Sequence, residues 1–119
     1  MAPPPDDDAA VEALNALVDQ LDRTRAELGR AVERGHQLVE LRESGRSWLE
    51  IVQTEERPLI IERISQALDE LGAAGSRFRR EEALALAREE VSITEISRMF
   101  GVSRQRVSTL VQEQPVPPT

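Results

Sequence analysis

Hydrophobic residues recur at helical spacing through most of the chain, and the longest such stretch comes first. From Asp6 to Glu43 there is no proline, and alanine, leucine, glutamate and arginine dominate. Within it, valine and leucine alternate at spacings of four and three, the a and d positions of a heptad repeat. These positions hold Val11, Leu14, Val18, Leu21, Leu28, Val32 and Val39. The pattern predicts one long helix over residues 6–44, or two helices with a break near Gly29 or Gly35.

The same heptad pattern favours self-association. Valine at a with leucine at d is typical of parallel two-stranded coiled coils. Arg25, Gly35 and Arg42 interrupt the seam, and a third apolar column (Leu17, Ala31, Leu38) makes it wider than a coiled coil requires. A helix that folds back within its own chain is therefore the alternative. The expected dimer interface consists of Val11, Leu14, Val18, Leu21, Leu28 and Val32.

Shorter helical segments follow. Gly45 is a good stop for the long helix, and Ser47 with Glu50 forms a capping box for a short one. The next helix is expected to bury a broad apolar face and to end at Gly72 and Gly75, with Ser76 as the N-cap of another helix. That broad face comprises Leu59, Ile60, Ile61, Ile64, Leu68 and Leu71.

No segment alternates for long enough to predict a strand, so the expected fold is all-α. The 119 residues suit one domain with an extension. We expect a long dimerisation helix over 6–44 and a compact helical domain over 46–113. Residues 1–5 and 114–119 are proline-rich tails, expected to be disordered.

Residues 92–111 carry the most specific pattern. Ile93, Ile96 and Phe100 fall on one face of a short helix. Gly101 supplies the positive φ of a tight turn, Val102 is expected to fill the angle between two helices, and Ser103 is a strong N-cap for the second helix. The buried stripe of that second helix is expected to be Val107, Leu110 and Val111.

The stretch EISRMFGVSRQRVSTLV within this segment resembles the general bacterial helix-turn-helix, and is most similar to the promoter-recognition helices of sigma factors and to many small bacterial regulators. The resemblance covers about a sixth of the chain, and Ser97 stands where that family more often has alanine. It implies that the second helix enters the DNA major groove. The matching positions are Ile96, Ser97, Phe100, Gly101, Val102, Val107 and Leu110.

In such a motif Arg104 is suited to a guanine edge and Gln105 to adenine. Arg98 and Arg106 are suited to phosphates, unless they pair with surface glutamates. Arg77, Arg79 and Arg80 form either a second phosphate patch or a solvated helix start. The candidate DNA-binding residues are Ser103, Arg104, Gln105, Arg106, Ser108, Thr109, Gln112 and Arg98.

Composition qualifies this picture. The net charge of −7 opposes DNA binding, because affinity depends on neutralised phosphates. Residues 1–75 carry 16 acids and 8 arginines, whereas residues 76–119 carry 6 acids and 7 arginines, so positive charge is local to the C-terminal part. The composition also bears on the source and the compartment of the protein. All 15 basic residues are arginine, which fits a GC-rich, actinobacterial-type genome. The absence of cysteine favours a reducing cytoplasm, and no apolar run approaches a membrane span.

Catalysis, a metal site and a cofactor are not expected, since the chain has one histidine (His36), no cysteine and no glycine-rich phosphate loop. Two functions remain. The first is a dimeric, sequence-specific transcriptional regulator that binds double-stranded DNA in the cytoplasm, associated with the nucleoid. The second is a protein-interaction adaptor or sigma-factor-binding regulator, for which another transcription protein is the partner and the helix-turn-helix is structural.

Overall fold

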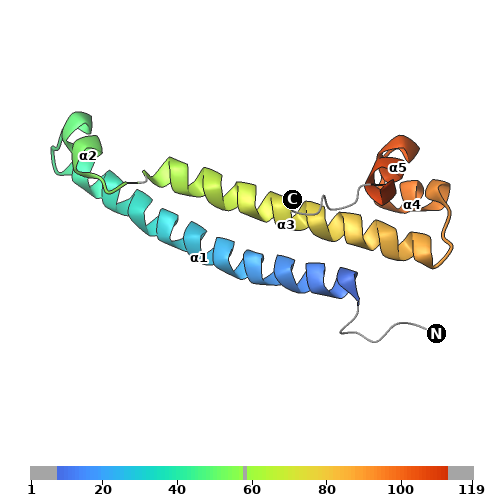
Figure 1. Ribbon diagram of the computed structural model, residues 1–119. Helices are drawn as coiled ribbons and strands as arrows, with labels where there is room; N and C mark the ends of the chain where they lie inside the picture. Colours follow the sequence, from blue (N-terminus) through green and yellow to red (C-terminus); the bar gives the residue numbers. More distant parts are fainter. Residues whose placement is uncertain (1–7, 58, 113–119) are drawn as a thin grey trace, which may run out of the picture. The chain divides into compact units, whose positions relative to one another are not determined.

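The computed structural model describes residues 8–57 and 59–112, and every regular element among them is a helix. The predicted all-α fold is therefore confirmed. The tails at 1–5 and 114–119 lie outside the described residues. The five helices (Figure 1) are α1 (Ala9–Glu43), α2 (Trp48–Thr54), α3 (Ile60–Arg88), α4 (Ile93–Phe100) and α5 (Arg104–Gln112).

These helices divide into two compact units. We call Val18–Ala73 the hairpin unit, and Met1–Leu17 with Ala74–Thr119 the terminal unit. The hairpin unit contains most of α1, all of α2 and the first half of α3. The terminal unit contains the second half of α3 followed by α4 and α5, together with the start of α1.

Helix α1 is continuous, so the sequence alternative of a break near Gly29 or Gly35 is wrong. Asp8 begins the helix, because its Oδ1 accepts a hydrogen bond from the backbone N–H of Ala10 at 2.9 Å. At the other end the N–H of Gly45 donates to the Arg42 carbonyl and that of Arg46 to the Leu41 carbonyl. Gly45 has φ 101°, and the two bonds form the Schellman arrangement that ends a helix.

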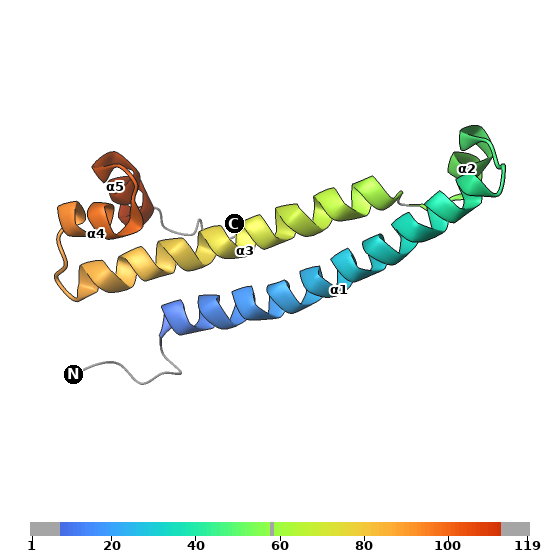
Figure 2. The same cartoon turned by 180° about the vertical axis from the view of Figure 1, so that it is seen from behind.

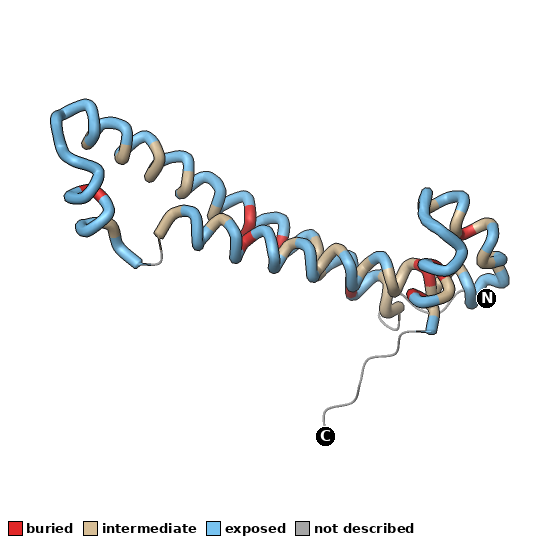
Figure 3. Tube along the Cα trace, turned by 90° about the horizontal axis from the view of Figure 1, so that it is seen from above, coloured by how far each residue is buried: buried red, intermediate tan, exposed pale blue. Residues whose placement is uncertain are grey.

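The interior of the hairpin unit is made of small and polar side chains. In it α1 and α3 run antiparallel, side by side (Figures 1 and 2). Thr24 and Ala67 are buried between them, and Gln20 donates from Nε2 to Thr24 Oγ1 at 3.3 Å. Ile51 of α2 is the one large apolar side chain that is fully buried among the described residues of this unit. Figure 3 shows how few positions along these helices are buried.

Helix α3 corrects two expectations. It runs through Gly72 and Gly75, which were expected to end it, and Ser76 lies inside it rather than capping a new helix. Neither glycine has positive φ. The cost of each glycine within a helix is only about 1 kcal/mol, and two good helix formers, Ala73 and Ala74, lie between them. The expected broad buried face is also narrower, because Ile61 and Leu68 are exposed.

Candidate nucleic-acid interface

Helices α4 and α5 are joined by a three-residue turn that hydrogen bonds hold closed. Ser92 caps α4 by accepting from the Glu95 N–H at 3.1 Å. Gly101 adopts φ 68° and ψ 31°, and its N–H donates to the Ser97 carbonyl. The Val102 N–H donates to the same carbonyl at 3.2 Å. The left-handed conformation expected at Gly101 is therefore confirmed.

Ser103 caps α5 as the sequence predicted, since its Oγ accepts from the Arg106 N–H at 3.0 Å. Ser97, the departure from the resembled family, has a bonding role of its own: its hydroxyl donates to the Val102 carbonyl. Alanine at this position lacks that donor. Apart from the small size of the side chain, nothing in the sequence indicated this contact.

The inward sides of α4 and α5 form the core of the terminal unit. Ile96, Val107 and Leu110 are buried, as is Ala83 of α3. Val102 is 38% exposed, so it does not fill the angle between the helices as expected. The buried residues of α5 fix which of its sides is left outward.

That outward side of α5 carries most of the predicted DNA-contacting residues. Val107 and Leu110 face the core, so residues at spacings of four and three on the opposite side, Gln105, Thr109 and Gln112, point away from it. Arg104 and Arg106 are also exposed, whereas Ser108 is half-buried. Thr109 donates from Oγ1 to the Gln105 carbonyl at 3.0 Å, so its proton is already engaged within the helix.

Arg104 and Arg106 differ from Arg98 in the charges around them. Among the described residues, neither Arg104 nor Arg106 forms an ion pair with a carboxylate. Arg98 instead pairs with Glu95 one turn away on α4. The hydrogen bond to Glu95, with its charge, raises the pKa of Arg98. Arg98 would have to leave Glu95 to reach a phosphate.

The cluster Arg77, Arg79 and Arg80 lies in the middle of α3 and not at a helix start, which corrects the second expectation for it. Arg79 is engaged twice: with Glu82 at 3.4 Å and with the ring of Phe100, whose centroid lies 4.1 Å from the guanidinium carbon. Arg80 is half-buried, and its Nε has no hydrogen-bond partner among the described atoms. Arg79 thus ties α3 to α4 rather than standing free.

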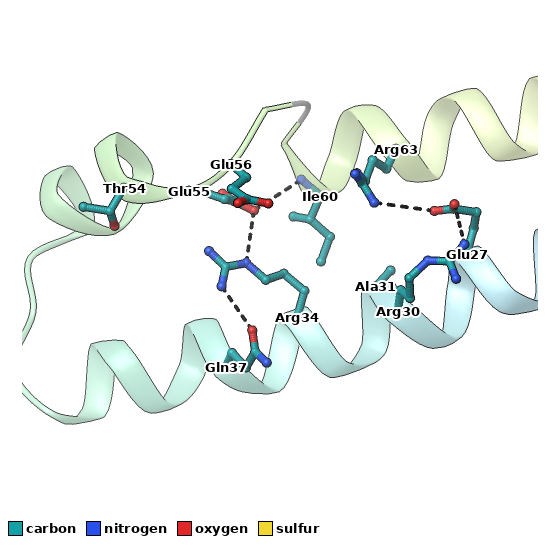
Figure 4. Close-up of a pocket in the computed structure, with 10 residues that line it drawn as sticks. All are labelled: Glu27, Arg30, Ala31, Arg34, Gln37, Thr54, Glu55, Glu56, Ile60 and Arg63. Carbon is teal, nitrogen blue, oxygen red and sulfur yellow. Dashed lines mark hydrogen bonds and ion pairs between the residues drawn. The ribbon is translucent and has the colours of Figure 1, made fainter.

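A cleft of about 410 Å³ in the hairpin unit is the other candidate binding site (Figure 4). Five of the six charged side chains that line it are already in ion pairs. Arg34 Nε lies 3.8 Å from Glu55 Oε1, and Arg63 Nη1 lies 3.9 Å from Glu27 Oε2. Glu55 also accepts from the Ile60 N–H at 3.3 Å and so stabilises the start of α3. The cleft is a set of ion pairs that fastens α1, α2 and α3, which the sequence did not reveal.

In the part of the chain that the structure describes, no three histidine, cysteine or acidic residues are grouped to hold a metal ion. None of the described helices combines the length and the apolar character that crossing a bilayer requires. No protein-family model, curated protein or solved structure matches the chain.

Proposed function

We propose that the protein is a sequence-specific DNA-binding transcriptional regulator in which α4 and α5 act as a helix-turn-helix. One observation carries the proposal: the first turn of α5 exposes Arg104, Gln105 and Arg106 without a carboxylate partner among the described residues, while Val107 and Leu110 hold the other side of the helix in the core. A short helix that is packed against the core on one side and carries unpaired positive charge on the other is suited to binding in the DNA major groove.

The chemistry of each position follows from its place on α5. Arg104 offers two hydrogen bonds to a guanine edge, and Gln105 offers a donor and an acceptor to adenine. Arg106 lies at the flank and neutralises a phosphate. The first-turn N–H groups that Ser103 does not cap and the positive end of the helix dipole add attraction for phosphate oxygens. Binding of this kind would place the protein at the nucleoid.

Selection from a random duplex library, followed by anisotropy titration of the enriched duplex, tests the proposal. The affinity should fall as salt rises, because bound phosphates release counterions. Arg104→Ala should weaken binding by about tenfold or more. Arg57→Ala is the matched control: Arg57 lies in the hairpin unit, and its side chain is 73% exposed and paired with Glu62. Absence of any enriched or bound duplex at low salt would refute the proposal.

A second candidate function is a protein adaptor that contacts another transcription protein. The observation that favours it is the apolar exposure of α2, where Trp48, Leu49 and Val52 are 55%, 67% and 45% exposed. Isolated apolar residues are common on surfaces, but three on one short helix are typical of a docking patch. This function predicts binding to purified RNA polymerase holoenzyme that Trp48→Ala abolishes and Arg104→Ala leaves unchanged.

A further inference from the structure

The hairpin unit has one polar side and one apolar side. The polar side carries the Glu27–Arg63 ion pair, with Arg30 and Glu70 beside it. On α1 the residues Val18, Leu21, Leu28, Val32 and Val39 are all between 38% and 62% exposed. On α3 Ile61 and Leu68 are 67% and 50% exposed. We call these seven positions the hairpin face.

The two helices contribute to this face by the same geometric rule. On α1 Leu21 directly follows the buried Gln20, and Val32 follows the half-buried Ala31. On α3 Leu68 directly follows the buried Ala67. One residue is a rotation of about 100° around a helix. Because α1 and α3 run antiparallel, equal rotations away from their contact bring both exposed rows to the same side of the pair.

The unit is poorly supplied with apolar burial of its own. Its two helices meet through Gln20, Thr24 and Ala67, none of which is a large apolar side chain. An amphipathic helix is stable only when its apolar stripe is covered by another element. Seven exposed apolar side chains on one side therefore mark a surface that is covered when the protein functions.

The chain itself points to the occupant. Valine at a with leucine at d is a pattern of helices that pair with their own kind. The face is about 32 Å long from Val18 to Val39, and it is two helices, about 20 Å, wide only from Val18 to about Ala31, where α3 begins beside α1. About 500 Å² on each of two copies, about 1,000 Å² in total, reaches the lower limit for a specific interface. Residues 1–7 and 113–119 contain few apolar side chains beyond Met1 and Val116, so they do not suit this surface.

We infer that the hairpin face binds the hairpin face of a second copy of this chain, giving a four-helix bundle of two α1–α3 hairpins. When a two-fold axis relates the two copies, the same face of each copy is buried in the contact, so that face is complementary to itself. The inference differs from a coiled coil of α1 alone because α3 takes part. It does not rest on DNA binding, and it places the pairing in a unit that contains none of the predicted DNA-contacting residues.

Light scattering of the full chain measures the pairing. Wild-type protein should have the mass of two chains, and its Tm should rise with protein concentration. Leu21→Glu and Leu68→Glu should each reduce the mass to that of one chain, because both place a charge in the apolar contact. Both residues are about half exposed in the single chain, so circular dichroism should still show helix.

Ala26→Glu is the matched control. Ala26 is an exposed residue of α1 on the polar side, near Arg23 and Arg30, so the same charge there should leave the mass of two chains unchanged. Wild-type protein with the mass of one chain and a Tm independent of concentration would overturn the inference. So would a loss of pairing in Leu21→Glu but not in Leu68→Glu, which would indicate pairing through α1 alone. Arg104→Ala should pair as wild type does, which separates this test from that of DNA binding.

Discussion

The guanidinium of Arg79 lies over the aromatic ring of Phe100, with 4.1 Å between its central carbon and the ring centroid. The contact joins α3 to α4 within the terminal unit. A cation above an aromatic face is attracted by the negative potential that the ring quadrupole creates there. An arginine that the sequence suggested for phosphate binding therefore helps to fix the position of α4, and through α4 the position of α5.

Replacement of Arg79 by alanine should consequently lower the free energy of unfolding. The expected loss is about 0.5–1 kcal/mol, the range for a cation–π pair at an exposed site. Chemical denaturation followed by circular dichroism measures it. Arg77→Ala is the control, because Arg77 is an exposed neighbour on the same helix. Equal losses in the two variants would show that the Phe100 contact contributes nothing.

The turn at Gly101 gives a second prediction. Gly101 has φ 68°, and beyond the glycine and its two chain neighbours no atom lies within 4 Å of the place where a Cβ would stand. Gly101→Ala should therefore destabilise through backbone strain alone, by about 1–2 kcal/mol. Gly29 also has no neighbour within 4 Å but lies inside α1. Gly29→Ala should stabilise by about 0.5–1 kcal/mol, so thermal unfolding should shift in opposite directions for the two variants.

The features that the sequence predicted well depend on residues that are close together along the chain. Ser92 and Ser103 cap helices because a serine oxygen reaches an N–H three residues on. The left-handed conformation of Gly101 could be predicted because so short a turn between helices needs a residue with positive φ, which glycine adopts readily. Such signals act within one turn of helix, so they are visible in a single segment.

The features that the sequence did not predict depend on which elements meet. Glycine is a common helix stop, yet α3 continues through Gly72 and Gly75, neither of which adopts the left-handed conformation that ends a helix. Ile61 and Leu68 belong to an apolar pattern that fits burial, but α3 contacts α1 through the adjacent row that contains Ala67. The Glu55 contacts with Arg34 and the Ile60 N–H join three separate segments, so no local pattern announces them.

The ion pairs of the hairpin unit predict a pH dependence. The hydrogen bond from Arg30, at 2.6 Å, and the charges of Arg30 and Arg63 hold the pKa of Glu27 below its usual value of 4.5. A lowered pKa in the folded state stabilises the protein above pH 4.5, and this contribution disappears as the pH falls through the folded-state pKa. The Tm difference between wild type and Glu27→Gln should therefore shrink on acidification. A difference that stays constant from neutral to acidic pH would contradict it.

The pairing of Arg98 with Glu95 gives the sharpest prediction for DNA binding. If α4 lies beside the phosphate backbone, Glu95 both repels the phosphates and holds Arg98 away from them. Glu95→Gln keeps a side chain suited to the start of α4, but it releases Arg98 and removes one negative charge. The affinity for the selected duplex should rise several-fold, and the slope of log affinity against log salt concentration should steepen by about 0.9 for one more neutralised phosphate.

Glu40→Gln is the control for this prediction, because it makes the same change in net charge on the exposed surface of α1, within the hairpin unit. An equal rise in both variants would mean that total charge, and not the freed Arg98, controls affinity; no rise in Glu95→Gln would place α4 away from the DNA.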